Sequence, residues 1–284
     1  RRPPRSTLDR SSAASDVYKR QIPMITAYDY TTARIVESSG IPIILVGDSL
    51  GQVVLGYKTT VPVTIEQIIH HATAVVRGTK TTHIVADMPF MSFQTDLKSA
   101  VVNAGQILKQ SGAQSVKIEG GSHMAKTIKT LVEIGIPVMG HIGLTPQSFN
   151  QLGGYKIQGK SLAEGKRLIE DAISVQDSGA YAVVLELIPS EIAQIITNKL
   201  NIPTIGIGSG EYCDGQVQVI NDVLGMDSNF QPKHSKQYVD LSSIIGEAIK
   251  NYGDDVRDKK FPTAVESFNL PKDVYDDLIN AINN

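Results

Sequence analysis

The chain has 284 residues, 41% of them hydrophobic and 20% charged, which is the composition of an ordinary globular protein with one large core. The formal net charge is −2, and beyond residue 20 there is no run of lysine and arginine, so nucleic acid is a poor candidate partner. No apolar stretch approaches the roughly 18 residues of a membrane span. The single cysteine, Cys213, excludes an intrachain disulfide and fits a reducing cytoplasm.

Residues 1–21 differ from the rest of the chain. They are rich in arginine, serine and proline and show no hydrophobic periodicity, so burial could not repay the entropy of ordering them. A transit peptide has a similar composition, but two acidic residues in this segment count against that reading. We expect residues 1–21 to be disordered or to be unrelated sequence fused upstream.

From Ile22 onward one type of joint recurs. Residues 39–42, 134–137 and 200–203 each carry Gly or Asn followed by Ile-Pro, after a helical pattern and before an apolar run. Gly or Asn closes a helix in the left-handed conformation, and the proline then favours extended chain. Residues 111–113 and 178–180 make the same joint without proline. Five such joints predict a repeating strand–helix unit.

The apolar runs predict eight strands, at Met24–Tyr28, Ile43–Val46, His83–Ala86, Ser115–Ile118, Val138–His141, Ala182–Leu185, Thr204–Ile207 and within Val217–Val223. Helical patterns separate them, at Ile65–Val76, Leu97–Lys109, Met124–Glu133, Glu164–Asp177 and Glu191–Lys199. Eight such units predict a (β/α)8 TIM barrel. An open doubly wound sheet is the alternative, but residues 28–30 are not the dinucleotide fingerprint expected after its first strand.

Polar side chains cluster at the predicted carboxyl ends of these strands, where a barrel places its active site. They are Asp48, Ser49, Asp87, Lys117, Glu119, His141, Glu186 and the glycines of 206–210. Asp48 follows the apolar run 41–47. Its alternative role is that of an Asx-turn acceptor that caps the next segment.

Three carboxylates without cysteine or paired histidine ligands favour a hard, oxygen-preferring ion, Mg²⁺ before Zn²⁺. Asp48, Asp87 and Glu119 are the candidate metal ligands. Lys117 and Glu119 alternate along one strand and so share a face, and a structural ion pair between them is the alternative.

Glu186 interrupts a buried apolar run, so it is either paired or a base with a raised pKa. His141 could bind metal, contact substrate or be a satisfied core histidine, and we favour a substrate or orienting contact. The glycines at 206–210 are weak evidence for a phosphate cradle, because they could equally permit close backbone approach.

Seven segments carry a resemblance to a known family: residues 25–29, 45–51, 86–91, 116–121, 140–147, 153–159 and 205–210. In this order they closely resemble the 3-methyl-2-oxobutanoate (ketopantoate) hydroxymethyltransferases of pantothenate synthesis. The resemblance covers about residues 22–268, which we expect to form the catalytic barrel, of the phosphoenolpyruvate/pyruvate-binding type. Residues 1–21 have no counterpart, and residues 269–284 are expected to be a helical C-terminal extension.

The resemblance implies a cytoplasmic homodecamer that transfers a hydroxymethyl group from 5,10-methylenetetrahydrofolate to 3-methyl-2-oxobutanoate, giving 2-dehydropantoate through a Mg²⁺-stabilised enolate. Carried over by motif, the metal group is Asp48, Asp87 and Glu119, and the proton acceptor is Glu186. The implied substrate contacts are Asp48, Ser49, Asp87 and Lys117, to which our own reading adds His141.

Three other functions stay open at this point. An aldolase with a Schiff base on Lys117 would need that amine neutral, although Glu119 would stabilise its charge. A metal-dependent lyase of the phosphoenolpyruvate/pyruvate type and a non-catalytic barrel that acts as a binding protein are the others.

Overall fold

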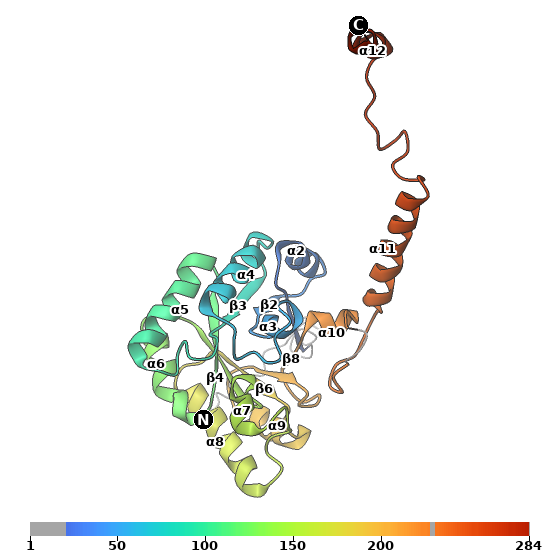
Figure 1. The fold of residues 1–284 in the computed structure, drawn as a ribbon. Coiled ribbons are helices and arrows are strands. Elements are labelled where there is room, and N and C mark those ends of the chain that lie inside the picture. The colour runs from blue at the N-terminus through green and yellow to red at the C-terminus, as the bar shows by residue number, and fades with distance from the viewer. Residues whose placement is uncertain (1–20, 228–230, 284) are drawn as a thin grey trace, which may run out of the picture. The chain divides into compact units, whose positions relative to one another are not determined.

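The computed structural model describes residues 21–227 and 231–283, except for the side chain of Leu152. Eight parallel strands close into a barrel in the order β1 to β8, with helices around it (Figure 1). The strands are β1 Ile22–Thr26, β2 Ile43–Val46, β3 His83–Asp87, β4 Ser115–Glu119, β5 Val138–Gly143, β6 Ala182–Glu186, β7 Thr204–Ile207 and β8 Gly215–Gln218. The predicted (β/α)8 barrel is confirmed.

The helices that follow the strands are α2 Tyr30–Ser38, α3 Leu50–Val53, α4 Ile65–Arg77, α5 Leu97–Ser111, α6 Ala125–Glu133, α7 Phe149–Leu152, α8 Leu162–Asp177, α9 Ser190–Lys199 and α10 Ile220–Leu224. Two 3-10 turns, η1 Ser122–Met124 and η2 Pro146–Ser148, precede α6 and α7. Two further helices, α11 Leu241–Arg257 and α12 Lys272–Asn283, end the described chain.

Local signals explain where the larger helices begin and end. Thr64 with Gln67, and Ser161 with Glu164, form reciprocal capping boxes at the starts of α4 and α8. Gly112, with φ of 82°, closes α5 in the left-handed conformation that a side chain would strain. Gly40, Gly135 and Gly179 are left-handed at three more of the predicted joints, whereas Asn201 is not, and α9 ends in extended chain at Leu200.

The bounds of the first and eighth strands differ from the predicted ranges. The first strand begins at Ile22 rather than Met24 and ends at Thr26, because Ala27 and Tyr28 are buried outside the sheet. The eighth strand is Gly215–Gln218, and most of the predicted range forms α10 instead. A short apolar run does not distinguish a buried strand from a buried helix, and β8 itself carries two glutamines.

Apolar side chains from alternate strand positions fill the interior of the barrel. The buried cluster consists of Met24, Leu45, Val85, Met139, Ala182, Val184, Ile205, Ile207 and Val217. Burying a side chain of this size stabilises the fold by roughly 1.5–3 kcal/mol. Since the middle of the barrel is filled with apolar side chains, the predicted acids, lysine and histidine lie at the mouth formed by the carboxyl ends of the strands.

The described chain divides into two compact units. The first holds the barrel and ends at Val223, with Pro232–Lys236 added, and the second comprises the described residues of 224–231 and those from Gln237 onward. This division falls well before Phe268, where we expected the barrel domain to end.

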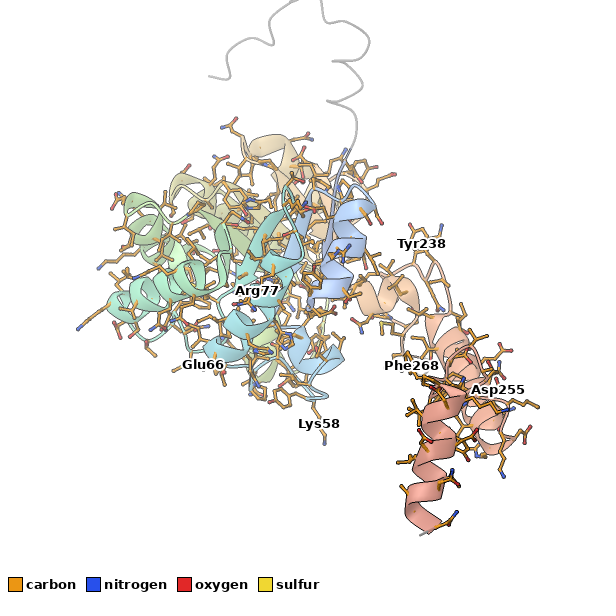
Figure 2. The ribbon with its side chains drawn as sticks, turned by 90° about the horizontal axis from the view of Figure 1, so that it is seen from above. Lys58, Glu66, Arg77, Tyr238, Asp255 and Phe268 are labelled. Carbon is orange, nitrogen blue, oxygen red and sulfur yellow. The ribbon has the colours of Figure 1, made fainter. Side chains whose placement is uncertain are left out.

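Surface charges such as Glu66 and Arg77 on α4, and Asp255 on α11, are exposed (Figure 2). Among the described helices, none has the length and apolar character needed to cross a membrane.

Candidate active site

Strand register brings the predicted acids and bases together at the mouth. Asp87 at the end of β3 is paired with Lys117 of β4, and Glu119 at the end of β4 is paired with His141 of β5. All four are at most 5% exposed. Their side chains point into the mouth because inward positions alternate along a strand, as the sequence predicted for Lys117 and Glu119.

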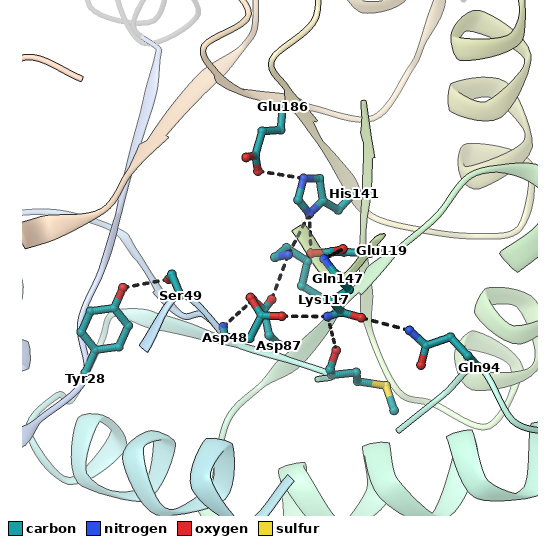
Figure 3. Close-up of polar contacts among 11 residues, drawn as sticks. Tyr28, Asp48, Ser49, Asp87, Gln94, Lys117, Glu119, His141, Gln147 and Glu186 are labelled. Carbon is teal, nitrogen blue, oxygen red and sulfur yellow. Dashed lines mark hydrogen bonds and ion pairs between the residues drawn. The ribbon is translucent and has the colours of Figure 1, made fainter. Parts of the chain in front are cut away.

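Asp87 links the loop after β2 to β4 (Figure 3). Its Oδ2 accepts a hydrogen bond of 2.9 Å from the backbone N–H of Asp48, and its Oδ1 lies 3.0 Å from Lys117 Nζ. Burial opposes the charge of the lysine, but the neighbouring carboxylates, first Asp87, outweigh it and raise its pKa. The neighbouring carboxylates therefore favour the charged form of Lys117 in this buried site.

His141 lies between Lys117 and two glutamates. Its Nδ1 is 3.0 Å from Lys117 Nζ and 3.6 Å from Glu119 Oε1, and its Nε2 is 3.1 Å from Glu186 Oε2. Burial, with the adjacent ammonium of Lys117, holds the pKa of His141 well below its usual value. A neutral imidazole accepts from the lysine at Nδ1 and so carries its proton at Nε2, facing Glu186.

Glu186 at the end of β6 is the acid with access to the mouth, since its side chain is 15% exposed. Burial raises its pKa to about 7, against the lowering influence of Lys117 and of His234. A carboxylate that titrates near neutral pH is suited to accept a proton in general base catalysis.

The backbone around Glu186 is tightly defined. A side chain at Gly143, whose φ is 97°, would collide with the carbonyl oxygen of Glu186. The next residue, Leu187, adopts a left-handed φ of 45°, a strained conformation that such sites often hold. Ser209 Oγ donates to Leu185 O at 2.7 Å and accepts from Ile188 N at 3.3 Å. These contacts hold the carboxylate in place.

Ser49 follows Asp48 and forms a 2.9 Å hydrogen bond with the hydroxyl of Tyr28. Tyr28 is 5% exposed, and burial raises its pKa, so it is a neutral phenol. The pair fixes the rotamer of Ser49 beside the acidic cluster (Figure 3).

Gln147, in the turn η2 after β5, is a site residue that the strand-end inventory missed. Its backbone N–H donates to Glu119 Oε2 at 3.0 Å, and its Nε2 donates to Asp48 Oδ2 and to Met88 O, both at 2.9 Å. Gln94 Nε2 donates to its Oε1 at 3.0 Å. Gln147 ends the segment 140–147 that carries the family resemblance, but no periodicity marks a residue in a 3-10 turn.

The site holds more negative than positive charge. Burial first, and then Asp87, raises the pKa of Asp48 to about 7, and burial with Asp48 raises the pKa of Glu119 well above its ordinary value. One ammonium, that of Lys117, faces this group. Bringing a cation to the cluster would favour the ionised forms.

These residues fit a divalent ion that shares its coordination with substrate oxygens and water. No three Asp, Glu, His or Cys side chains of the described residues converge to enclose an ion by themselves. Mg²⁺ usually takes only one or two carboxylates and keeps other oxygen ligands. Glu119 Oε1 is buried without a hydrogen-bond partner among the described residues, and Asp87 Oδ1 has its ion pair alone. Both are oxygens that a hard ion would bind.

The structure thus joins six of the predicted site residues in one network at the mouth, Asp48, Asp87, Lys117, Glu119, His141 and Glu186. Ser49 lies beside this network, and its side chain is hydrogen-bonded to Tyr28. The predicted glycine segment 206–210 instead packs closely against neighbouring side chains. His234, near enough to Glu186 to influence its pKa, was not singled out in the sequence, since it lies in an irregular segment.

The loop after α7 is bonded to α3. After β5 the chain runs through α7, and Tyr155 OH donates to Gln52 Oε1 of α3 at 3.3 Å. The Tyr155 ring also contacts Phe149, with 5.1 Å between centroids. Since α3 follows β2, this loop joins elements three strands apart in the barrel.

Solved structures share the closed parallel barrel fold of this chain. Phosphonopyruvate hydrolase, solved with oxalate and Mg²⁺, has a TM-score of 0.56 at 10% identity, with 93% of each chain covered. The 2,3-dimethylmalate lyase, a member of the PEP mutase/isocitrate lyase superfamily, has a TM-score of 0.54 at 14% identity and covers 96% of this chain and 99% of its own. These likenesses show the same closed α/β barrel fold.

Sequence comparison is more specific. A family model described as ketopantoate hydroxymethyltransferase matches residues 10–264. The 3-methyl-2-oxobutanoate hydroxymethyltransferase of Dehalococcoides mccartyi is 56% identical over 260 residues, 92% of this chain and 93% of that protein. The chain belongs to the ketopantoate hydroxymethyltransferase family.

The matched range differs from the domain boundaries that we expect, which stay a prediction. It begins at residue 10, inside the segment 1–21 for which we expected no counterpart. Residues 1–20 lie outside the described part of the structure. The match ends at residue 264, and the helix α12 lies in the C-terminal segment beyond it.

Proposed function

We propose that this protein transfers a hydroxymethyl group from 5,10-methylenetetrahydrofolate to 3-methyl-2-oxobutanoate, giving 2-dehydropantoate. The family supports the reaction, and one structural observation supports placing the reaction at this barrel mouth. That observation is a buried glutamate with a pKa near 7, Glu186, at the same barrel mouth as a lysine and three further carboxylates.

The first requirement is to bind a 2-oxo acid. Its carboxylate needs a positive partner, and the buried ammonium of Lys117 provides one that keeps its charge. Ser49, with its hydroxyl positioned by Tyr28, offers a hydrogen bond at the same mouth, alongside Asp48 and Asp87.

The second requirement is to remove the C3 proton. Glu186 accepts it, because a carboxylate with a pKa near neutrality is both ionised and basic enough at physiological pH. His141 Nε2 lies 3.1 Å from Glu186 Oε2, so the imidazole is the immediate neighbour of this carboxylate. The resulting carbanion forms a bond to the methylene carbon of the folate, and the two carbon–nitrogen bonds of that carbon break to leave tetrahydrofolate. Water supplies the hydroxyl oxygen of the product, and the protons from water and from C3 go to the two folate nitrogens.

Asp48, Asp87 and Glu119 would hold Mg²⁺, directly or through water. When bound there, the ion supplies a Lewis acid that polarises the 2-oxo group and lowers the pKa of the C3 proton. Asp48 and Asp87 are already held side by side by the hydrogen bond from the Asp48 amide.

The charge on Lys117 argues against a Schiff-base aldolase, since that mechanism needs a neutral amine. Borohydride in the presence of the 2-oxo acid should leave Lys117 unmodified. The fold likeness to lyases of the superfamily carries no information on activity at 10–14% identity.

The decisive experiment supplies 3-methyl-2-oxobutanoate and Mg²⁺ with and without 5,10-methylenetetrahydrofolate and measures 2-dehydropantoate by mass spectrometry. We expect product only with the folate. Cleavage of 2-dehydropantoate or a related acid that proceeds without any folate would favour a lyase instead.

We further propose that the protein works as a cytoplasmic homo-oligomer, a decamer by family resemblance. Helix α11 supports association, because Ile245, Ile249, Tyr252 and Val256 form an exposed apolar stripe along it. A second copy of the chain is the partner we propose for this stripe.

A further inference from the structure

Gln147 occupies an unusual position in the network, because a single neutral residue bonds two of the acidic groups proposed to hold the ion. Its side chain reaches Asp48 Oδ2 and its backbone reaches Glu119 Oε2. The two carboxylates come from the loop after β2 and the end of β4, so Gln147 ties together elements that are two strands apart. It is itself only 5% exposed.

The orientation of the Gln147 amide is fully determined. Its two N–H groups face two acceptors, Asp48 Oδ2 and Met88 O, and its oxygen accepts from Gln94. A flipped amide would place its oxygen against two acceptors and its nitrogen against a donor. The Met88 carbonyl can only accept, so it fixes the end of the amide that meets Asp48, and the bond from Gln94 holds the other end (Figure 3).

The bonds from Gln147 determine which oxygens of Asp48 and Glu119 remain available to an ion. Gln147 bonds one oxygen of each carboxylate and leaves the other, and Glu119 Oε1 has no hydrogen-bond partner among the described residues. An amide donor is also uncharged, so it restrains the carboxylates without neutralising them as an arginine or lysine would.

We infer that Gln147 is a positioning residue that presents Asp48 and Glu119 to the divalent ion, and that Gln94 holds Gln147 in the required orientation. The inference rests on the proposed function, since it concerns the same ion site. Residues that orient metal ligands through hydrogen bonds typically change metal affinity or activity by about 10–100-fold when replaced.

The test measures binding of Mn²⁺, a spectroscopically visible substitute for Mg²⁺, to the full-length protein by electron paramagnetic resonance, without substrate. Gln147→Met keeps the length of the side chain and the backbone bond to Glu119 but removes the amide. We expect it to weaken Mn²⁺ binding about 10–100-fold. Gln94→Met keeps Gln147 and frees its amide, and should weaken binding in the same direction by a smaller factor.

Gln114→Met is the matched control. Gln114 Oε1 accepts from the backbone N–H of Ile84 at 2.7 Å, at the opposite end of β3 from Asp87, so its loss should leave Mn²⁺ binding unchanged. Activity gives a second readout. For Gln147→Met the Mg²⁺ concentration for half-maximal rate should rise, while kcat at saturating Mg²⁺ stays near that of the wild type.

Wild-type Mn²⁺ affinity in Gln147→Met would overturn the inference while leaving the proposed function intact. If that variant does not fold, Gln94→Met decides the question, and wild-type affinity there would overturn it equally. Absence of Mn²⁺ binding by the wild-type protein, with or without the 2-oxo acid, would instead refute the ion site of the proposed function.

Discussion

At the scale of single residues, Glu186 and Asp48 show how burial sets chemistry. Both are carboxylates whose pKa lies near 7, chiefly because burial penalises their charge, yet their surroundings differ. Asp48 has Asp87 and Gln147 as partners, which suits a ligand of a cation. Glu186 faces a neutral histidine and partly faces solvent, which suits a proton acceptor.

The raised pKa of Glu186 predicts a pH dependence. A raised pKa means that the carboxyl group stays protonated up to higher pH, so the active base is lost as pH falls through about 7. Exchange of the substrate C3 proton should decline roughly tenfold per pH unit below that value. The rate followed by NMR in D2O across the pH range, at saturating Mg²⁺, measures this, and a flat profile down to the ordinary pKa of a glutamate would contradict it.

Asp87→Asn tests the proposed ion site by removing the charge of one of its carboxylates. The change removes a negative charge at nearly constant shape, so Mg²⁺ affinity and turnover should fall together by about 10-fold or more, and added Mg²⁺ should partly restore the rate. The Mg²⁺ dependence of turnover is the measurement. An unchanged dependence in the variant would remove Asp87 from the ion site.

At the scale of elements, much of the site followed from strand ends, because parallel strands in a barrel deliver their last residues to one mouth. The residues that were missed, Gln147 and His234, lie in a 3-10 turn and an irregular segment, where periodicity carries no signal. The eighth strand was misplaced for a related reason. Its residues alternate glutamine with smaller side chains, whereas the adjacent α10 carries the apolar run.

The loop after α7 yields an element-scale prediction. Tyr155 holds this loop to α3 through Gln52 and packs on Phe149, so Tyr155→Ala should free the loop and raise the KM for the 2-oxo acid about 3–10-fold, with a smaller change in kcat. Tyr155→Phe keeps the ring contact and loses only the hydrogen bond, so its effect should be smaller. Steady-state kinetics of both variants would contradict this role if KM stayed at the wild-type value in Tyr155→Ala.

At the scale of the whole molecule, the exposed stripe on α11 predicts association. Ile249→Lys places a charge in the middle of the stripe, and the mass measured by light scattering after size-exclusion chromatography should fall below that of the wild-type oligomer. Asn251→Lys adds the same charge about 160° around the helix and should leave the mass unchanged. A wild-type mass for Ile249→Lys would exclude the stripe from the interface.

In the proposed reaction, Glu186 removes the C3 proton of a 2-oxo acid bound through Lys117 and the acidic cluster. Exchange of that proton with solvent deuterium, measured by NMR with 3-methyl-2-oxobutanoate and Mg²⁺ but no folate, isolates the step. Glu186→Gln should leave binding of the 2-oxo acid nearly intact and reduce exchange roughly 10²–10⁴-fold, the usual effect of a positioned general base. Near-wild-type exchange in Glu186→Gln would contradict the account and assign the proton to another group.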